Sequence, residues 1–311
     1  MHEPNLDFYI PTDIPPEILA YGSDVKQLGV GKAGKIGALI LGLERDNEVG
    51  RTVVKEQYTK VPLYTQRALY LEESLPSMAY MYIISPSGGI LQGDRYRMDI
   101  ALKNNASAHL TTQGATRVYR MENNYATQMV NIVVDNGCYL EFIPDQIIPY
   151  RNSRFYQIVD LNVHVNATMI YSEIIMPGRV ASGESFQYDI CYLKALGKDQ
   201  NQRLRFIDNA ILEPKKNNMK VPGILGSFDV IGSIYILTNA NYLKQLDSQI
   251  NSNLQSMSQI SGGATILPNN SGIITRILGN SSGDIRTAIY EVLRIVRRLI
   301  LDASFSGIRK G

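Results

Sequence analysis

Two carboxylates follow glycines in polar segments of the chain, and such acids can play either of two parts. Asp94 ends the segment Ser85–Asp94, and Glu184 lies in the segment Pro177–Phe186. Between these two in the sequence lies another glycine-marked segment, Thr111–Arg120, which carries no acid. After a glycine bend a carboxylate can accept backbone N–H groups, or it can point into a cavity and hold a cation loosely. The spacing alone leaves both roles open.

Side chains that bind transition metals tightly are scarce. Zinc and nickel are usually held by imidazole and thiolate ligands that lie close together. No C-x-x-C, H-x-H or H-x-x-x-H pair is formed by the available residues, which are His2, His109, His164, Cys138 and Cys191. The fold could still bring distant members of this set together, but with so few of them we expect no permanently bound metal or cofactor.

The segment Gly29–Ile36 approaches the phosphate-binding pattern G-x-x-x-x-G-K-[ST] without completing it. The last position should supply a hydroxyl for Mg²⁺, and here it is Ile36, which cannot bind a hard cation. The segment also leads into a strand pattern instead of joining a strand to a helix. We expect a flexible lead into the first strand, and no nucleotide hydrolysis.

These residues must be positioned mostly by strands, because apolar and polar residues alternate from Lys35 to about Leu237. One strand that is half-exposed to water carries its apolar face on Tyr96, Met98, Ile100 and Leu102. Many short strands at fairly even spacing predict an all-β sandwich, a barrel or a coil of sheets.

Two connections have distinct composition. Asp135-Asn136-Gly137 separates the strand patterns 128–134 and 138–143, and Asn-Gly tolerates positive φ, so the sequence predicts a hairpin there. The stretch from Gly262 to Gly272 is rich in glycine and small polar residues, which predicts a loop.

Helical periodicity is confined to the last third of the chain. Apolar residues recur every three or four positions over 241–259 and again, as a broader stripe, over 284–303. Ser281 and Asp284 form a capping arrangement before the second run. The sequence therefore predicts two helices, at about 241–259 and 284–303.

The composition narrows the class of protein. The chain has 311 residues, and 31 Lys and Arg against 29 Asp and Glu give a net charge of +2, which argues against nucleic-acid binding. Two cysteines exclude a disulfide scaffold and fit a reducing compartment. The N-terminus has no secretory pattern, and no apolar run there approaches the roughly 20 residues that span a bilayer. We expect a cytoplasmic protein that contacts no membrane.

The three glycine-marked segments, in this order, resemble those of the urease accessory protein UreD family, called UreH in some bacteria. The resemblance continues through Leu140–Pro149, similar to the family's L-E-[YF]-x-P-x-x-x-I-P stretch, and through Gly272–Gly279 and the arginine-containing final helix. The chain differs from the family in two places. Ser87 stands where the family usually has another glycine, and the final helix lacks the tryptophan that is often found there.

The resemblance implies both a fold and a division of the chain. The fold would be mainly β, an open helix-like winding of β-strands in stacked sheets with two α-helices in the C-terminal third. Residues 1–30 have no clear counterpart and would be a poorly ordered N-terminal extension, while residues 31–311 would form a single UreD-like domain.

The resemblance also implies a non-enzymatic function. UreD-like proteins bind apo-urease and recruit UreF, which in turn recruits the GTPase UreG, so that nickel is inserted and the active site matures. This chain would accordingly be an adaptor or metallochaperone in urease maturation, with nickel bound only transiently.

A cation passed between proteins must be held weakly at each step, which oxygen and amide ligands allow better than thiolate clusters. Our hypothesis is that Asp94 and Glu184 line or support an internal polar passage for nickel, with Glu141 as a weaker third candidate. The competing account is that Asp94 and Glu184 cap turns. A partner could dock on the C-terminal tail, for which the candidate residues are Phe305, Ile308 and Arg309.

Two other functions stay open. Wound sheets often carry acidic pairs, so a carbohydrate-active β-solenoid enzyme is the alternative, although the absence of tryptophan disfavours sugar stacking. A nucleotide-dependent enzyme is disfavoured by Ile36.

Overall fold

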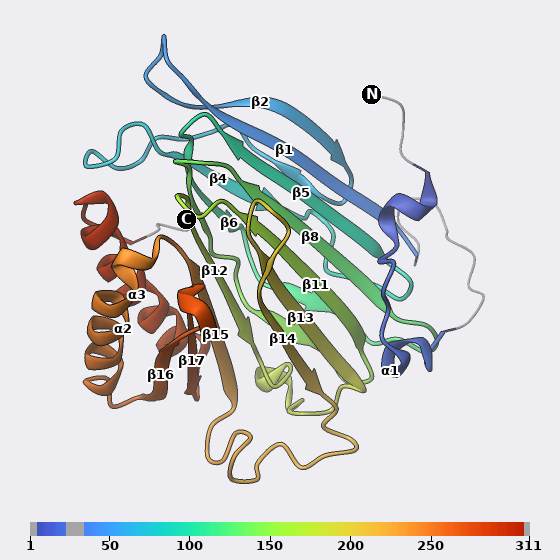
Figure 1. Cartoon of the computed structure of the whole chain (residues 1–311). Helices are drawn as coiled ribbons and strands as arrows, with labels where there is room; N and C mark the ends of the chain where they lie inside the picture. Colours follow the sequence, from blue (N-terminus) through green and yellow to red (C-terminus); the bar gives the residue numbers. More distant parts are fainter. Residues whose placement is uncertain (1–4, 23–33, 308–311) are drawn as a thin grey trace.

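The computed structural model describes residues 5–22 and 34–307, and within them two β-sheets are stacked face to face (Figure 1). The seven-stranded sheet consists, in spatial order, of β14 (Leu204–Leu212), β13 (Ile190–Lys198), β11 (Arg154–Val163), β8 (Ala126–Val134), β5 (Arg95–Lys103), β1 (Ile36–Asp46) and β2 (Arg51–Lys60). The ten-stranded sheet consists of β16 (Ile260–Ile266), β17 (Ile273–Gly279), β15 (Val230–Leu237), β12 (Thr168–Ile175), β9 (Tyr139–Phe142), β6 (Ser107–Thr112), β4 (Ala79–Ile84) and β3 (Tyr64–Thr65), with β10 (Ile147–Pro149) joining β12 to β7 (Thr116–Val118).

The chain winds repeatedly from one sheet to the other. Strands β5, β8, β11 and β13 pair in parallel in the seven-stranded sheet, while β4, β6, β9 and β12 pair in parallel in the ten-stranded sheet. Parallel neighbours need a long crossover, and here a strand of the opposite sheet provides it. The mainly β fold predicted as a winding of stacked sheets is confirmed.

Alternation decides which side chains fill the space between the sheets. In β5, Tyr96, Met98, Ile100 and Leu102 are buried in the inter-sheet core, as predicted. Arg97 is half-exposed on the opposite face, where its guanidinium lies 3.8 Å above the centroid of the Phe8 ring. A period of two therefore gives each strand one face for the core and one for water or a covering segment.

The predicted hairpin around Asn136 is wrong. Strand β8 pairs with β5 and β11 in the seven-stranded sheet, whereas β9 pairs with β6 and β12 in the ten-stranded sheet. The turn therefore carries the chain between sheets, with Gly137 at φ +71°. Asn-Gly chemistry specifies a tight turn, but both flanking strands have buried faces that pair with strands distant in the sequence.

Two long helices cover the outer face of the ten-stranded sheet (Figure 1). Helix α2 spans Ala240–Gln255, and helix α3 spans Ser282–Leu301, capped by the Ser281 side chain, which accepts from the Asp284 N–H. Both predicted helices are confirmed. The loop predicted for 262–272 is wrong in its first half, because β16 pairs with β17 there and the 3₁₀ turn Pro268–Asn270 follows.

The N-terminal segment 5–22 lies on the outer face of the seven-stranded sheet (Figure 1). It contains the 3₁₀ turn Leu6–Tyr9 and the short helix α1, Pro16–Leu19. Ile18 is fully buried in a small cluster with residues of this sheet and of the loop before it, namely Tyr125, Tyr156, Ile190 and Tyr192. We call residues 5–22 the N-terminal strap. Across the described residues, no helix has the length and apolar character needed to cross a lipid bilayer.

Candidate functional site

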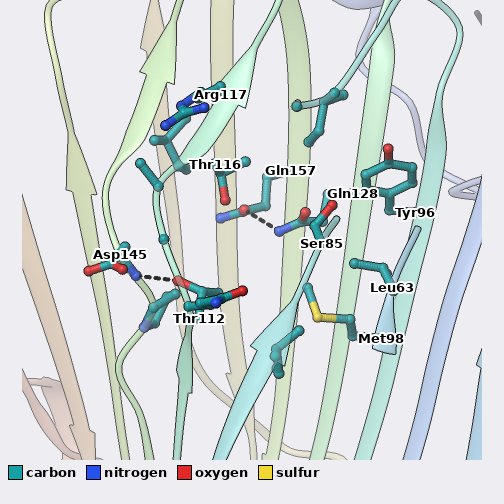
Figure 2. A pocket seen from close by; sticks show the side chains of 18 of the residues that line it. Leu63, Ser85, Tyr96, Met98, Thr112, Thr116, Arg117, Gln128, Asp145 and Gln157 are labelled. Carbon is teal, nitrogen blue, oxygen red and sulfur yellow. Dashed lines mark hydrogen bonds between the residues drawn. The ribbon is translucent and has the colours of Figure 1, made fainter. Parts of the chain in front are cut away.

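A cavity of about 370 Å³ lies between the two sheets, and two of the glycine-marked segments form part of its lining (Figure 2). The first segment contributes Ser85 and Gly89, among others, and the second contributes Thr112, Thr116 and Arg117. Ile90 and Val118 form a parallel bridge that joins the two segments. The fold therefore brings together residues that the sequence separates by about thirty positions.

Glycine is required at one position of this lining. A Cβ on Gly89 would lie 2.4 Å from the Arg117 carbonyl oxygen and 2.7 Å from Cε2 of Tyr119. Real Cβ atoms do not approach backbone oxygen so closely, so only glycine lets these two segments pack together. Gly114, which also lines the cavity, would meet nothing within 4 Å.

Polar side chains from three strands meet at the inner wall of the cavity. Gln128 on β8 donates from Nε2 to Oε1 of Gln157 on β11, at 3.0 Å (Figure 2). Gln157 Nε2 in turn donates to Oε1 of Glu173 on β12, at 3.0 Å, and the Tyr171 hydroxyl donates to the same oxygen at 2.6 Å. All four residues line the cavity, which gives it an oxygen- and amide-rich inner wall.

Glu173 is a buried acid with no cationic side chain bonded to it among the described residues. Burial raises the pKa of its carboxyl to about 7, although the Tyr171 hydrogen bond and the charge of Arg276 act in the opposite direction. Near neutral pH this carboxyl is therefore divided between its neutral and ionised forms.

Asp94 is fully buried at the turn before β5 and binds backbone amides. Its Oδ1 accepts from the Lys35 N–H and its Oδ2 from the Leu91 N–H, both at 2.8 Å. The Tyr96 hydroxyl also donates to Oδ2 at 3.0 Å, and Tyr96 lines the cavity. Burial raises the pKa of Asp94 while these amides oppose the rise. Asp94 thus holds the turn and supports the cavity wall through Tyr96.

Glu184 forms a two-pronged ion pair with Arg179, in which Nε donates to Oε2 at 2.9 Å and Nη2 donates to Oε1. The Arg179 hydrogen bond keeps the pKa of Glu184 below its usual range. Arg179 stacks over Tyr150, whose ring packs against that of Tyr119 beside Gly89. The third glycine-marked segment is therefore connected to the other two, but Glu184 does not itself line the cavity.

Glu141 faces helix α3, on the opposite side of the ten-stranded sheet from the cavity. Its two oxygens accept from Nε and Nη2 of Arg297, each at 2.7 Å, and Oε2 lies 2.5 Å from Nδ1 of His109. Burial opposes ionisation, but Arg297 outweighs it and lowers the pKa of Glu141 to about 2. The predicted acids are therefore not brought together: each is bound to its own partners.

The C-terminal tail returns to α3. Phe305 is buried and packs edge-on against Tyr290. The centroid of its ring lies 4.4 Å from Cζ of Arg297. The other two candidate partner residues, Ile308 and Arg309, lie outside the described residues, as do His2 and residues 29–33 of the segment that resembles a phosphate loop. Ile36, the last residue of that segment, is the first of β1.

Sequence reasoning missed the polar inner wall, although one signal was available. Glu173 is the single charged residue in the otherwise apolar or small run Met169–Met176, and it shares a strand face with Tyr171. A charged side chain is seldom buried inside a strand unless it has a specific partner or a function. No comparable signal marks Gln128 and Gln157, because only the winding of the chain places them beside Glu173.

The fold and cavity define a class of protein first. It is a wound two-sheet β-protein with a cavity between the sheets that polar and apolar side chains line together, and its described residues contain no group of three His, Cys, Asp or Glu side chains that could hold a metal ion. The model of one family, UreD urease accessory protein, matches residues 35–309. The chain therefore belongs to the UreD family, as the resemblance predicted.

Similar curated proteins cover nearly the whole chain. A protein of Cenarchaeum symbiosum named urease accessory protein UreD is 42% identical over 284 residues, covering 91% of this chain and 99% of its own length. Urease accessory protein UreD 2 of Brucella canis is 38% identical over 290 residues, covering 93% and 95%. Urease accessory protein UreD of Photorhabdus laumondii is 36% identical over 288 residues, covering 92% and 89%.

Proposed function

We propose that this chain is a urease accessory protein that acts as a non-enzymatic adaptor in the cytoplasm. It binds apo-urease, recruits UreF and through it UreG, and so enables nickel insertion. Membership of the UreD family over residues 35–309 carries this proposal. The two cysteines support the location, because both are buried and unpaired, as in a reducing compartment.

Co-expression with the cognate urease subunits tests the adaptor role. Urease purified from cells that also make this chain and the other accessory proteins should contain nickel and hydrolyse urea. Urease from cells lacking only this chain should contain little nickel, and a tagged form of the chain should retain the urease subunits and UreF. Full nickel loading without the chain would contradict the proposal.

The proposal includes a route for nickel through the inter-sheet cavity. The cavity supports this route because it offers amide, hydroxyl and carboxyl groups, which bind a borderline cation weakly enough to release it. In this scheme Asp94 and Glu184 act by holding the walls and neighbouring segments in place. Glu141 acts at a distance from the cavity, by anchoring α3 to the sheet.

Alanine substitution tests whether Asp94 and Glu184 are needed for nickel transfer and not only for folding of the chain. Asp94→Ala and Glu184→Ala should lower the nickel content of co-expressed urease while the variant chain still co-purifies with urease. Glu48→Gln, at an exposed turn, serves as the control. Unchanged nickel loading in both alanine variants would remove these acids from the route.

The C-terminal tail remains a proposed contact for UreF. Truncation after Ala303 should weaken that contact, and it should also reduce stability because it removes the buried Phe305. Point substitution of Ile308 or Arg309 avoids this complication. If neither substitution changes affinity for UreF, the tail is not part of the contact.

A further inference from the structure

One oxygen of Glu173 remains available to whatever occupies the cavity. Oε1 accepts from both Gln157 and Tyr171, whereas no hydrogen bond to Oε2 is made by any described residue. The residue is 5% exposed and lines the cavity. Its carboxyl is therefore held in a fixed orientation by one oxygen while the other is left for a proton or a ligand.

The surroundings of Glu173 hold little net charge. Arg276 on β17 and Asp208 on β14 act on it with opposite signs, and they form an ion pair with each other. The other titratable groups whose charge is linked to that of Glu173 are neutral when protonated, namely Tyr171 on its own strand, Tyr235 on β15 and Cys191 on β13. Gln128 and Gln157 are uncharged. The charge at this wall is therefore set mainly by Glu173 itself.

We propose that Glu173 exchanges a proton for a divalent cation at the inner wall of the cavity. When the cation enters, the O–H bond at Oε2 breaks, the proton passes to water in the cavity, and that oxygen binds the cation. When a proton returns to Oε2, the oxygen–cation bond breaks and the cation leaves. One proton is released for each cation bound, so charge and atoms balance. Only the identity of the cation, nickel, rests on the proposed function.

Such an exchange lets one buried acid both bind a divalent cation and release it again. A permanently ionised buried carboxylate would retain a divalent cation, and a permanently neutral acid would not attract one. A carboxyl with a pKa of about 7 lies between these limits, so a modest change of conditions moves it from one state to the other. While no cation is bound, protonation of Glu173 also avoids an uncompensated charge buried at the cavity wall.

Proton release during nickel binding tests the exchange directly. The full chain is titrated with nickel chloride in a calorimeter at pH 6 and pH 8, in two buffers of different ionisation enthalpy at each pH. About one proton per cation should be released at pH 6 and close to none at pH 8. The affinity should fall about tenfold per pH unit below pH 7. Absence of nickel binding at pH 8 would overturn the proposal.

Matched variants assign the proton to Glu173. Glu173→Gln keeps an oxygen that can accept from Gln157 and Tyr171 but cannot lose a proton, so proton release should disappear and affinity at pH 8 should fall at least tenfold. Glu173→Asp should still release a proton, and the exposed Glu48→Gln should match the unmodified chain. Unchanged proton release and affinity in Glu173→Gln would overturn the proposal.

The two proposals fail separately. If cells lacking this chain load urease with nickel normally, the proposed function is wrong, whereas the proton count of the purified chain is unaffected. If the chain is needed for nickel loading but Glu173→Gln titrates like the unmodified chain, only the proton exchange is wrong.

Discussion

A buried acid at the inner wall of the cavity should make the stability of this fold depend on pH. The pKa of Glu173 is about 7 in the folded chain and near 4.5 for an exposed glutamate. The folded state therefore holds the extra proton between these values, and stability is lost as the pH rises through that window. Above pH 7 the loss is complete, at about 3 kcal/mol.

Glu173→Gln should remove this loss, because glutamine does not titrate. Relative to the unmodified chain, the free energy of unfolding of the variant should increase by up to about 3 kcal/mol as the pH rises from 5 to 8. Urea unfolding at the two pH values measures the difference. A difference between the two chains that is the same at pH 5 and pH 8 would contradict a raised pKa at this residue.

At the scale of elements, one arginine fixes helix α3 to the ten-stranded sheet. Arg297 is fully buried and donates to Glu141, to Glu72 at 2.7 Å and to the Tyr80 hydroxyl at 2.9 Å. Arg297→Met should cost about 3–5 kcal/mol, since it leaves the Glu141 charge buried without its cation. Chemical denaturation measures the cost.

The next residue of the same helix provides the control. Arg298 is exposed and donates to Gln249 on α2, so Arg298→Met should change stability by only about 0.5 kcal/mol. Equal effects of the two substitutions would mean that the buried ion pair does not anchor the helix.

The lining of the cavity depends on one close approach between segments. Gly89→Ala should destabilise the fold by about 1–3 kcal/mol, because the new Cβ would meet the Arg117 carbonyl oxygen. Gly114→Ala, in the same lining but in open space, should be neutral or slightly stabilising. Thermal unfolding distinguishes the two. A well-tolerated alanine at 89 would show that the segments can separate without cost.

These elements also show what the sequence was able to predict. Helices α2 and α3 followed from their apolar stripes, because each stripe is a local pattern with one period. The hairpin after β8 failed because a turn sequence does not say which sheet receives the next strand. The cavity wall could not be predicted from spacing, since Gln128, Gln157 and Glu173 meet only after the chain has wound between the sheets.

At the scale of the whole molecule, the N-terminal strap is outside the segment that the family model matches and yet contacts the seven-stranded sheet. Its cluster around Ile18 is separate from the inter-sheet core and from the helix-covered core. Lys194 pairs with Asp13 at 2.8 Å, and the Tyr156 hydroxyl donates to the Asp13 carbonyl. Because the strap packs in a cluster of its own, we expect it to unfold independently of the two cores.

Ile18→Asp should therefore release the strap without unfolding the sheets. A charge in place of this fully buried side chain costs about 3 kcal/mol or more, which exceeds what so small a cluster can supply. Hydrogen exchange should show lost protection at residues 18–22 and unchanged protection in β5, β8 and β11. Leu19→Asp is the control, because Leu19 on the same helix is 52% exposed. Loss of protection in the sheets as well would mean that the strap and the wound body form one cooperative unit.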